Sequence, residues 1–419
     1  MANPKIEAAE AALSERPLPE GEARWARERR EAARARLLKM GLPAKRDEYW
    51  KYTDPGRLTA PLRPAEAVEP GPAERLFGEL EPAELVFVNG RFRADLSALS
   101  VPGVEIATLT DALRADLGWA RETFGALEEA GQEKVDRPLA ALNTAAATEG
   151  LAIRVTARAE RPLHIRYVQV GEGAAMVRHI VRVEKDAHAT LVESGAATST
   201  VMEAELREHG ELHHLRLQRG ERQPGVTHVF ARIGAEALFK TFTLTADGPL
   251  TRNEVVFDLQ GEGGLGHSAG GVVATGESHV DNTVFVTHSA PGCESRQVFK
   301  TVLDGRGRSA FQGKIFVRRP AQRTDGYQIS QAILLSDRAE FDVKPELEIY
   351  ADDVKCSHGS TTGAIDELAL FYLQSRGVPR KAAEAMLVAA FVDEAIMEIE
   401  NQTLADAMRE AVAAWMAAR

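Results

Sequence analysis

Cysteine is scarce in this chain, with only Cys293 and Cys356 in 419 residues. Two thiols cannot build a disulfide framework, so the sequence indicates a protein of a reducing cytosol. The N-terminus is charged and lacks the apolar segment of a secretion signal. No apolar run approaches the roughly 20 residues that a membrane-spanning helix needs. We therefore expect a cytoplasmic protein with no membrane partner.

Basic residues are outnumbered, because 51 lysines and arginines stand against 62 aspartates and glutamates, a net charge of −11. Broad nucleic-acid binding needs a basic surface that neutralises phosphates, so this composition argues against a nucleic-acid partner. The length allows two or three structural units with a large buried core.

The motifs of several enzyme classes are missing. The chain has no phosphate-binding loop, no His-Glu-x-x-His and no Cys-x-x-Cys. Residues 261–266 (GEGGLG) match a dinucleotide-binding motif, and 266–270 (GHSAG) match the nucleophile elbow of hydrolases. Both motifs need a helix directly after them, whereas the sequence that follows is Gly-rich and strand-like. We expect a flexible loop here and no self-sufficient active site.

The N-terminal part of the chain combines helical patterns, a short strand and an irregular connection. Helix-forming residues fill 22–40 and stop at Gly41. Six prolines between 55 and 82 predict an irregular connection. A short strand at 85–88 runs into an Asn-Gly turn, and 111–131 has a helical pattern.

From about residue 151 apolar and polar residues alternate in segments of five to eight residues, which is typical of strands. No helical pattern separates these segments, which argues against a crossover sheet with helices. The alternatives are a sandwich, a barrel or a stacked solenoid. Most links lack the two-residue Asn-Gly turn, which favours the solenoid, although no strict short repeat is visible.

The chain becomes helical again after Gly363. One helix is expected over 365–375, a second from Arg380, and a third from Leu404 to the end. An apolar stripe recurs every four residues in the second helix, at Leu387, Phe391, Ala395 and Ile399. Such a stripe normally packs on a core; the alternative is a helical module that docks a partner.

Cys356 and His358 are the best candidates for chemistry. Residues two apart on a strand point to the same face, so the thiol and the imidazole are expected side by side. This donor pair suits iron or zinc, yet a structural metal site needs four ligands and the pair supplies two. From the residues alone, a buried thiol beside a packed histidine is the favoured interpretation. Cys293 lies in a Pro-Gly turn and is expected to be incidental.

Several segments resemble the SufB/SufD family of iron–sulfur cluster assembly proteins. The longest is 345–391, PELEIYADDVKCSHGSTTGAIDELALFYLQSRGVPRKAAEAMLVAAF, which contains the Cys-x-His pair. Further similar segments lie at 41–58, 86–92, 287–317 and 321–336. The motif Trp-Lys-Tyr-Thr at 50–53 and the low cysteine content resemble the SufD type more than the SufB type.

The resemblance implies a mainly β fold with helical flanks: a right-handed parallel β-helix core between N-terminal and C-terminal helical regions. The expected regions are 1–140, 141–362 and 363–419. It also implies a non-enzymatic scaffold subunit in a complex with SufB and with the ATPase SufC, which would dock on the C-terminal helices. Binding of reduced flavin by the whole complex is a weaker implication.

By the same resemblance, His358, with Cys356 beside it, binds iron or a nascent, transient iron–sulfur cluster completed by SufB. A pair too small for a metal site would then be half of a site shared between two chains. Two other functions stay open: a SufB-like scaffold that builds clusters on a homodimer, and a β-helix enzyme that acts on carbohydrate. The isolated chain is also a candidate homodimer.

Overall fold

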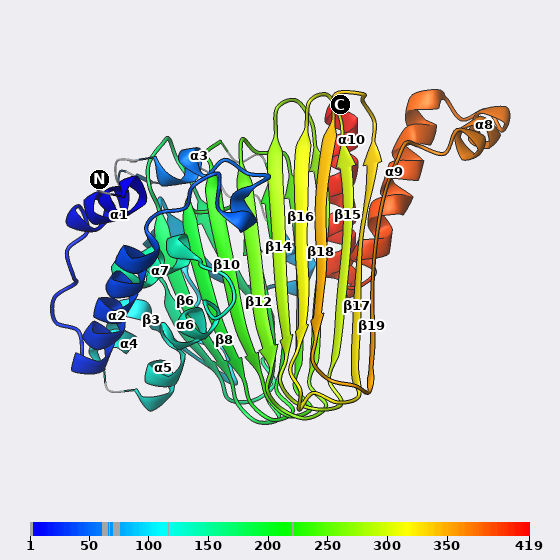
Figure 1. Ribbon diagram of the computed structural model, residues 1–419. Coiled ribbons are helices and arrows are strands. Elements are labelled where there is room, and N and C mark those ends of the chain that lie inside the picture. The colour runs from blue at the N-terminus through cyan, green and yellow to red at the C-terminus, as the bar shows by residue number, and fades with distance from the viewer. Residues whose placement is uncertain (1–2, 61–65, 67, 70–75, 116, 220–221) are drawn as a thin grey trace.

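The alternating segments fold into a parallel β-helix (Figure 1), as seen in a computed structural model that describes residues 3–60, 66, 68–69, 76–115, 117–219 and 222–419. From β4 onward, successive strands alternate between two sheets, so each coil contributes one strand to each sheet. The solenoid expected from the sequence is confirmed, and the sandwich and the barrel are excluded. Within the described part of the chain, none of the helices combines the length and apolarity required to cross a membrane.

The two sheets have ten and nine strands. The ten-stranded sheet contains, in spatial order, β19 (Val354–Gly363), β17 (Thr324–Leu334), β15 (Glu294–Leu303), β13 (Leu265–Ala274), β11 (Leu238–Ala246), β9 (Glu211–Arg219), β7 (His188–Ser194), β5 (Leu163–Val168), β1 (Ala83–Val88) and β2 (Arg91–Phe92). The nine-stranded sheet contains β18 (Glu340–Ile349), β16 (Arg308–Val317), β14 (His279–His288), β12 (Thr251–Leu259), β10 (Gly225–Ile233), β8 (Ser199–Leu206), β6 (Met176–Val183), β4 (Leu151–Val155) and β3 (Val104–Thr108).

The length of a coil changes along the solenoid. Residues paired between β7 and β9 are 23 apart in sequence, as Ala189 and Leu212 show. Residues paired between β15 and β17 are 31 apart, as Ser295 and Gly326 show. A coil that lengthens in this way leaves no constant period, which is why no repeat is visible in the sequence.

Apolar side chains from both sheets fill the interior of the solenoid. Two glycines of β13 make room for aromatic rings there. A Cβ on Gly266 would lie 2.4 Å from Phe257, and a Cβ on Gly270 would lie 2.6 Å from Phe299. Residues 266–270 belong to strand β13, so the flexible loop predicted for them is wrong. Only 261–264 form a turn.

The N-terminal part holds seven α-helices in the described ranges and the first three strands. The helices are α1 (Pro4–Ser14), α2 (Arg24–Met40), α3 (Gly56–Thr59), α4 (Leu109–Arg114), α5 (Gly118–Thr123), α6 (Ala126–Ala130) and α7 (Pro138–Ala146). Helix α2 ends at Gly41, which has a φ of 70°, and β1 pairs with β2 across the Asn-Gly turn, both as predicted. The predicted helix at 111–131 is three short helices. Part of the Pro-rich connection, at 61–65, 67 and 70–75, lies outside the described residues.

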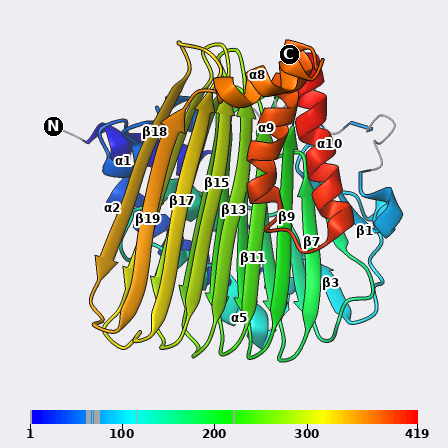
Figure 2. The ribbon, with the colours of Figure 1, turned by 90° about the vertical axis from the view of Figure 1, so that its right-hand side faces the viewer.

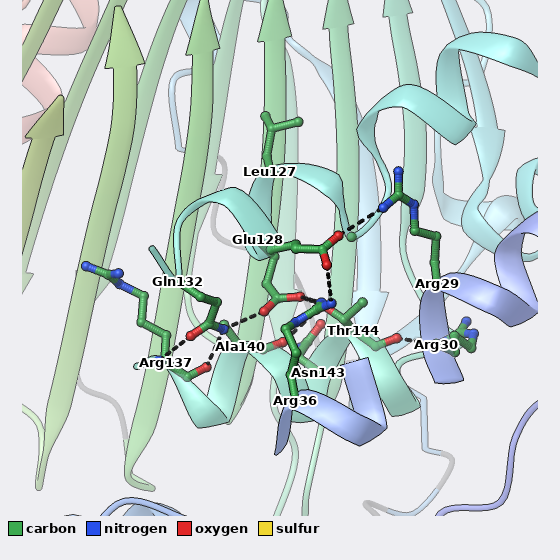
Figure 3. Close-up of polar contacts among 12 residues, drawn as sticks. Arg29, Arg30, Arg36, Leu127, Glu128, Gln132, Arg137, Ala140, Asn143 and Thr144 are labelled. Carbon is green, nitrogen blue, oxygen red and sulfur yellow. Dashed lines mark hydrogen bonds and ion pairs between the residues drawn. The ribbon is translucent and has the colours of Figure 1, made fainter. Parts of the chain in front are cut away.

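The N-terminal helices cover the outer face of the nine-stranded sheet (Figure 1) through buried charges. Arg178 and Glu203 are fully buried and 2.6 Å apart. Glu203 also accepts backbone N–H groups of Gly125, Leu127 and Glu128, at the start of α6. Figure 3 shows the neighbouring network, in which Glu128 binds the guanidinium of Arg36. These contacts attach the helices to the sheet.

The C-terminal helices are α8 (Glu367–Ser375), α9 (Arg380–Ile396) and α10 (Gln402–Ala418). Helices α9 and α10 lie on the outer face of the ten-stranded sheet (Figure 2). The buried residues of α9 are Ala383, Val388, Val392, Ala395 and Ile396. This stripe lies about one position away from the predicted stripe and shares only Ala395 with it. Packing on the sheet, which the stripe predicted, is the observed role of α9.

Candidate functional site at the end of the solenoid

Strands β18 and β19 form the terminal coil, the last coil of the solenoid (Figure 2). Each is the last strand of its sheet, pairing with β16 and β17 respectively. Almost every residue of the two strands is exposed or half-buried, whereas β15 and β16 are almost entirely buried. The terminal coil therefore presents one uncovered edge per sheet and an uncovered end of the interior.

Cys356 lies on the inner side of β19. It is paired with Gly326 of β17, and a Cβ built on Gly326 would lie 3.3 Å from the Cys356 Sγ. Cys356 packs against the apolar cluster that includes Ile315 of the facing sheet. Burial raises the pKa of the thiol, although a backbone hydrogen bond with Gly326 acts in the opposite direction. Cys356 is thus protonated at neutral pH and half-buried.

His358 follows on the same side of the strand. Its partner in the register is Gln328, which points into the solenoid, because its carboxamide fills the space beside Gly313 on the opposite sheet. Gln328 is fully buried, whereas His358 is exposed because no further coil covers it. No hydrogen bond or ion pair to the imidazole is found among the described residues. The imidazole is therefore available to a ligand from outside the chain.

A row of polar side chains leads through the interior to His358. Its members occupy in-register positions on successive strands of the ten-stranded sheet: His214, Thr241, Ser268, Gln297, Gln328 and His358. All but His358 are buried. The Ser268 hydroxyl and both carboxamides have polar atoms without a partner in the described structure. Only the register brings these residues into one row, so no pattern in the sequence could have revealed it.

A buried ionic cluster stands at the other end of this row. The Glu193 carboxylate lies 2.7 Å from His214 and 2.6 Å from Arg216, and it accepts the Tyr167 hydroxyl at 2.7 Å. Burial opposes ionisation, yet Arg216 and His214 hold the pKa of Glu193 well below its usual range. His179, 2.8 Å from the Tyr167 hydroxyl, has a pKa of about 4 because burial disfavours its charged form.

Other candidate ligands do not assemble into a metal centre. Across the described residues, no group of three or more His, Cys, Asp or Glu side chains is placed to hold a metal ion. Cys293 is buried in the main core, where its thiol donates to the Gly261 carbonyl at 3.2 Å. Its position in a turn is as predicted, but the residue is a packed core thiol. The pair of Cys356 and His358 stands alone with two donors.

Helix α8 carries a second uncovered surface, and it projects away from the solenoid (Figure 1). Three large apolar side chains on it face solvent: Leu368 is 77% exposed, Phe371 67% and Tyr372 55%. Leu370 on the same helix is fully buried. Exposed apolar residues gathered on one short helix are typical of an interaction surface.

Comparison with known proteins places the chain in a family. A protein-family model described as "SUF system FeS cluster assembly, SufBD core domain" matches residues 167–391. This range includes β6 to β19, the terminal coil, α8 and most of α9. The match thus contains both surfaces described above.

Individual relatives match a larger part of the chain than the family model does. The iron–sulfur cluster assembly protein SufD of Escherichia coli is 30% identical over 88% of this chain and 88% of its own length. A SufBD family protein of Synechocystis is 28% identical over 92% of this chain and 90% of its own. SufD of Bacillus subtilis is 27% identical over 64% of each.

Proposed function

Because the chain belongs to the SufBD family of iron–sulfur cluster assembly proteins, we propose that it is a non-enzymatic scaffold subunit that pairs with a SufB-type protein through the terminal coil. His358 and Cys356 then hold part of a nascent cluster, the cargo of the assembly. The observation that carries the proposal is a thiol and an imidazole on the same inner face of an uncovered edge strand.

The uncovered edges support the pairing. A strand with a free edge exposes a row of unpaired N–H and C=O groups, and proteins normally cover such an edge. Both β18 and β19 end their sheets here, so a partner with a terminal coil of its own can extend both. The half-buried apolar side chains Phe341 and Val343 also gain cover from such a partner.

The donor atoms of Cys356 and His358 support iron as the proposed cargo. A soft thiolate and an imidazole suit iron, and a tetrahedral iron site takes four ligands. The terminal coil supplies two, so the others come from sulfide or from the partner. Iron must displace the proton of Cys356, whose pKa is raised by burial. His358 is exposed, so iron from outside the chain can reach its imidazole directly. This accessibility makes His358 the leading ligand.

The test uses the complete complex with the SufB-type partner and the ATPase, reconstituted anaerobically with iron and sulfide. In the His358→Ala variant we expect cluster content to fall several-fold, measured by absorption and by bound iron and sulfide. Ser357→Ala is the matched control, because Ser357 is exposed on the other face of the same strand. Unchanged cluster content in an intact His358→Ala complex would contradict the proposal.

Cys356 needs a separate variant, because its thiol also packs in the interior. Cys356→Ser keeps most of the volume and a weaker donor. If the variant forms the complex but loses the cluster, Cys356 binds the cluster. If the variant no longer forms the complex, the thiol is needed for packing. A stable cluster on the isolated chain, as a homodimer, would instead favour the SufB-like scaffold.

We further propose that the SufC-type ATPase docks on the C-terminal helices, at the apolar surface of α8. What supports this is the exposure of Leu368, Phe371 and Tyr372 on a helix that projects from the body. Helices α9 and α10 are part of the packed fold, where Val392 and Met408 are fully buried. Binding of reduced flavin by the whole complex stays a prediction.

A further inference from the structure

A cavity of about 370 Å³ lies beneath the links that follow β5, β7 and β9, away from the terminal coil. This volume is in the range of small-molecule pockets, roughly 300–1,000 Å³. Its wall includes three glutamines, Gln169, Gln218 and Gln223, and three arginines. All three carboxamide nitrogens are buried and have no hydrogen-bond partner in the described structure.

Hydrogen bonds engage the oxygen atoms of two of these carboxamides. The Gln223 Oε1 accepts the backbone N–H of Gly173 at 3.1 Å, and a backbone N–H can only donate. The Gln218 Oε1 accepts the hydroxyl of Thr245 at 2.9 Å. The same hydroxyl oxygen accepts from the Asn253 amide at 3.3 Å. Both NH₂ groups are therefore free donors, and Gln218 is only 1% exposed.

Three arginines contribute to the wall of the cavity. Arg166, Arg219 and Arg222 line it, and no aspartate or glutamate in the described part of the chain does. Arg166 is partly balanced by Glu84, with 3.3 Å between Nε and Oε2. Arg222 is exposed at the mouth.

We propose that this cavity binds the phosphate group of a small molecule. Free amide N–H groups and guanidinium groups are donors, and phosphate offers oxygens that accept from several directions at once. A buried donor without a partner is costly, so a ligand that satisfies these three carboxamides is bound favourably. A phosphate at Gln218 and Gln223 leaves the rest of the cavity for the remainder of the molecule. The proposal does not depend on the function of the terminal coil.

Isothermal titration calorimetry on the full chain at low ionic strength tests this, with inorganic phosphate, pyrophosphate and ADP as probes. We expect saturable binding of at least one probe. Tighter binding of ADP than of pyrophosphate shows that the organic part also fits the cavity, and equal binding shows that phosphate alone is recognised. Absence of saturation with all three probes at millimolar concentration would overturn the proposal.

Two variants and a control locate the binding. Gln223→Glu keeps an acceptor for the Gly173 N–H but turns a carboxylate oxygen toward the ligand, so affinity should fall at least tenfold. Arg222→Ala should weaken binding several-fold and reduce its dependence on salt. Because Arg222 is exposed, this variant folds even if Gln223→Glu does not. Arg121→Ala removes an exposed arginine of α5, outside the cavity wall, and should bind as the wild type does. Wild-type affinity in Arg222→Ala and Gln223→Glu would contradict the site.

Discussion

Cys356 lies beside Gly326 in the parallel pairing of β19 with β17, and its sulfur lies 3.3 Å from the point where a Cβ at 326 would stand. The glycine therefore determines how deeply the thiol enters the solenoid. The same register places His358 beside Gln328, at the end of the buried polar row. The positions of both candidate ligands thus depend on a strand about 30 residues earlier in the chain.

Gly326→Ala should expose the Cys356 thiol. The new Cβ would lie 3.3 Å from the sulfur and 3.4 Å from Ile315 Cγ2, contacts so tight that we expect the thiol to shift outward by a few tenths of an ångström. We expect a loss of about 1 kcal/mol in the free energy of unfolding, the lower range for overpacking. The rate of Cys356 alkylation, followed by mass spectrometry, should rise, while Cys293 stays protected. Gly359→Ala is the control, because nothing lies within 4 Å of its Cβ. An unchanged alkylation rate in Gly326→Ala would refute this packing.

A charge on α8 should prevent docking of the ATPase without unfolding the chain. Leu368→Asp and Phe371→Asp alter side chains that are 77% and 67% exposed, so stability should change by no more than about 0.5 kcal/mol. Binding of the SufC-type ATPase, measured by calorimetry or co-purification, should weaken at least tenfold. Leu99→Asp provides the control: Leu99 is 43% exposed and lies outside the C-terminal helices. Wild-type binding by both α8 variants would place the docking surface elsewhere.

The fold should lose stability as the pH falls from about 6.5 to 4. Burial lowers the pKa of His179, His228 and His288 to about 4, from the usual 6.5. Between these pH values the unfolded chain binds protons that the folded chain does not, so acid favours unfolding. At pH 5.5 each histidine should cost about 1 kcal/mol relative to pH 7.5.

Urea unfolding at pH 7.5, 6.5 and 5.5 measures this loss directly. His288→Leu should remove part of the pH dependence, because burial alone lowers the pKa of His288. The variant also loses a hydrogen bond to Ser295, which changes stability equally at every pH. Equal stability of the wild type at pH 7.5 and 5.5 would show that these histidines are not buried in their neutral form.

Removing one member of the buried pair between Arg178 and Glu203 should be strongly destabilising. Glu203→Ala leaves the Arg178 charge buried without its carboxylate, and it strips the acceptor from three N–H groups of α6. We expect a loss of about 3–5 kcal/mol in urea unfolding. The exposed pair of Arg24 and Glu28 is the contrast, where Glu28→Ala should cost less than about 1 kcal/mol. If Glu203→Ala also cost less than about 1 kcal/mol, water would have to reach the buried pair.

Local patterns in the sequence were enough to predict many of the elements. Helix-forming residues before a glycine place α2 and its end at Gly41, because both effects act within one turn. The alternation after 151 predicts strands for the same reason. Interactions between coils caused the errors: residues 266–270 are a strand because their glycines accommodate Phe257 and Phe299. The division of the chain at 140 and 362 stays a prediction.

By itself, then, the sequence indicated most of the elements and the Cys-x-His pair through short-range spacing, and its long motifs indicated the family and, with the family, the solenoid. The tertiary structure decided the register, and with it every relationship between distant residues: the glycine beneath Cys356, the polar row behind His358 and the donors around the cavity. Coils of changing length leave no period from which that register can be read. It becomes visible only where backbone hydrogen bonds join one coil to the next.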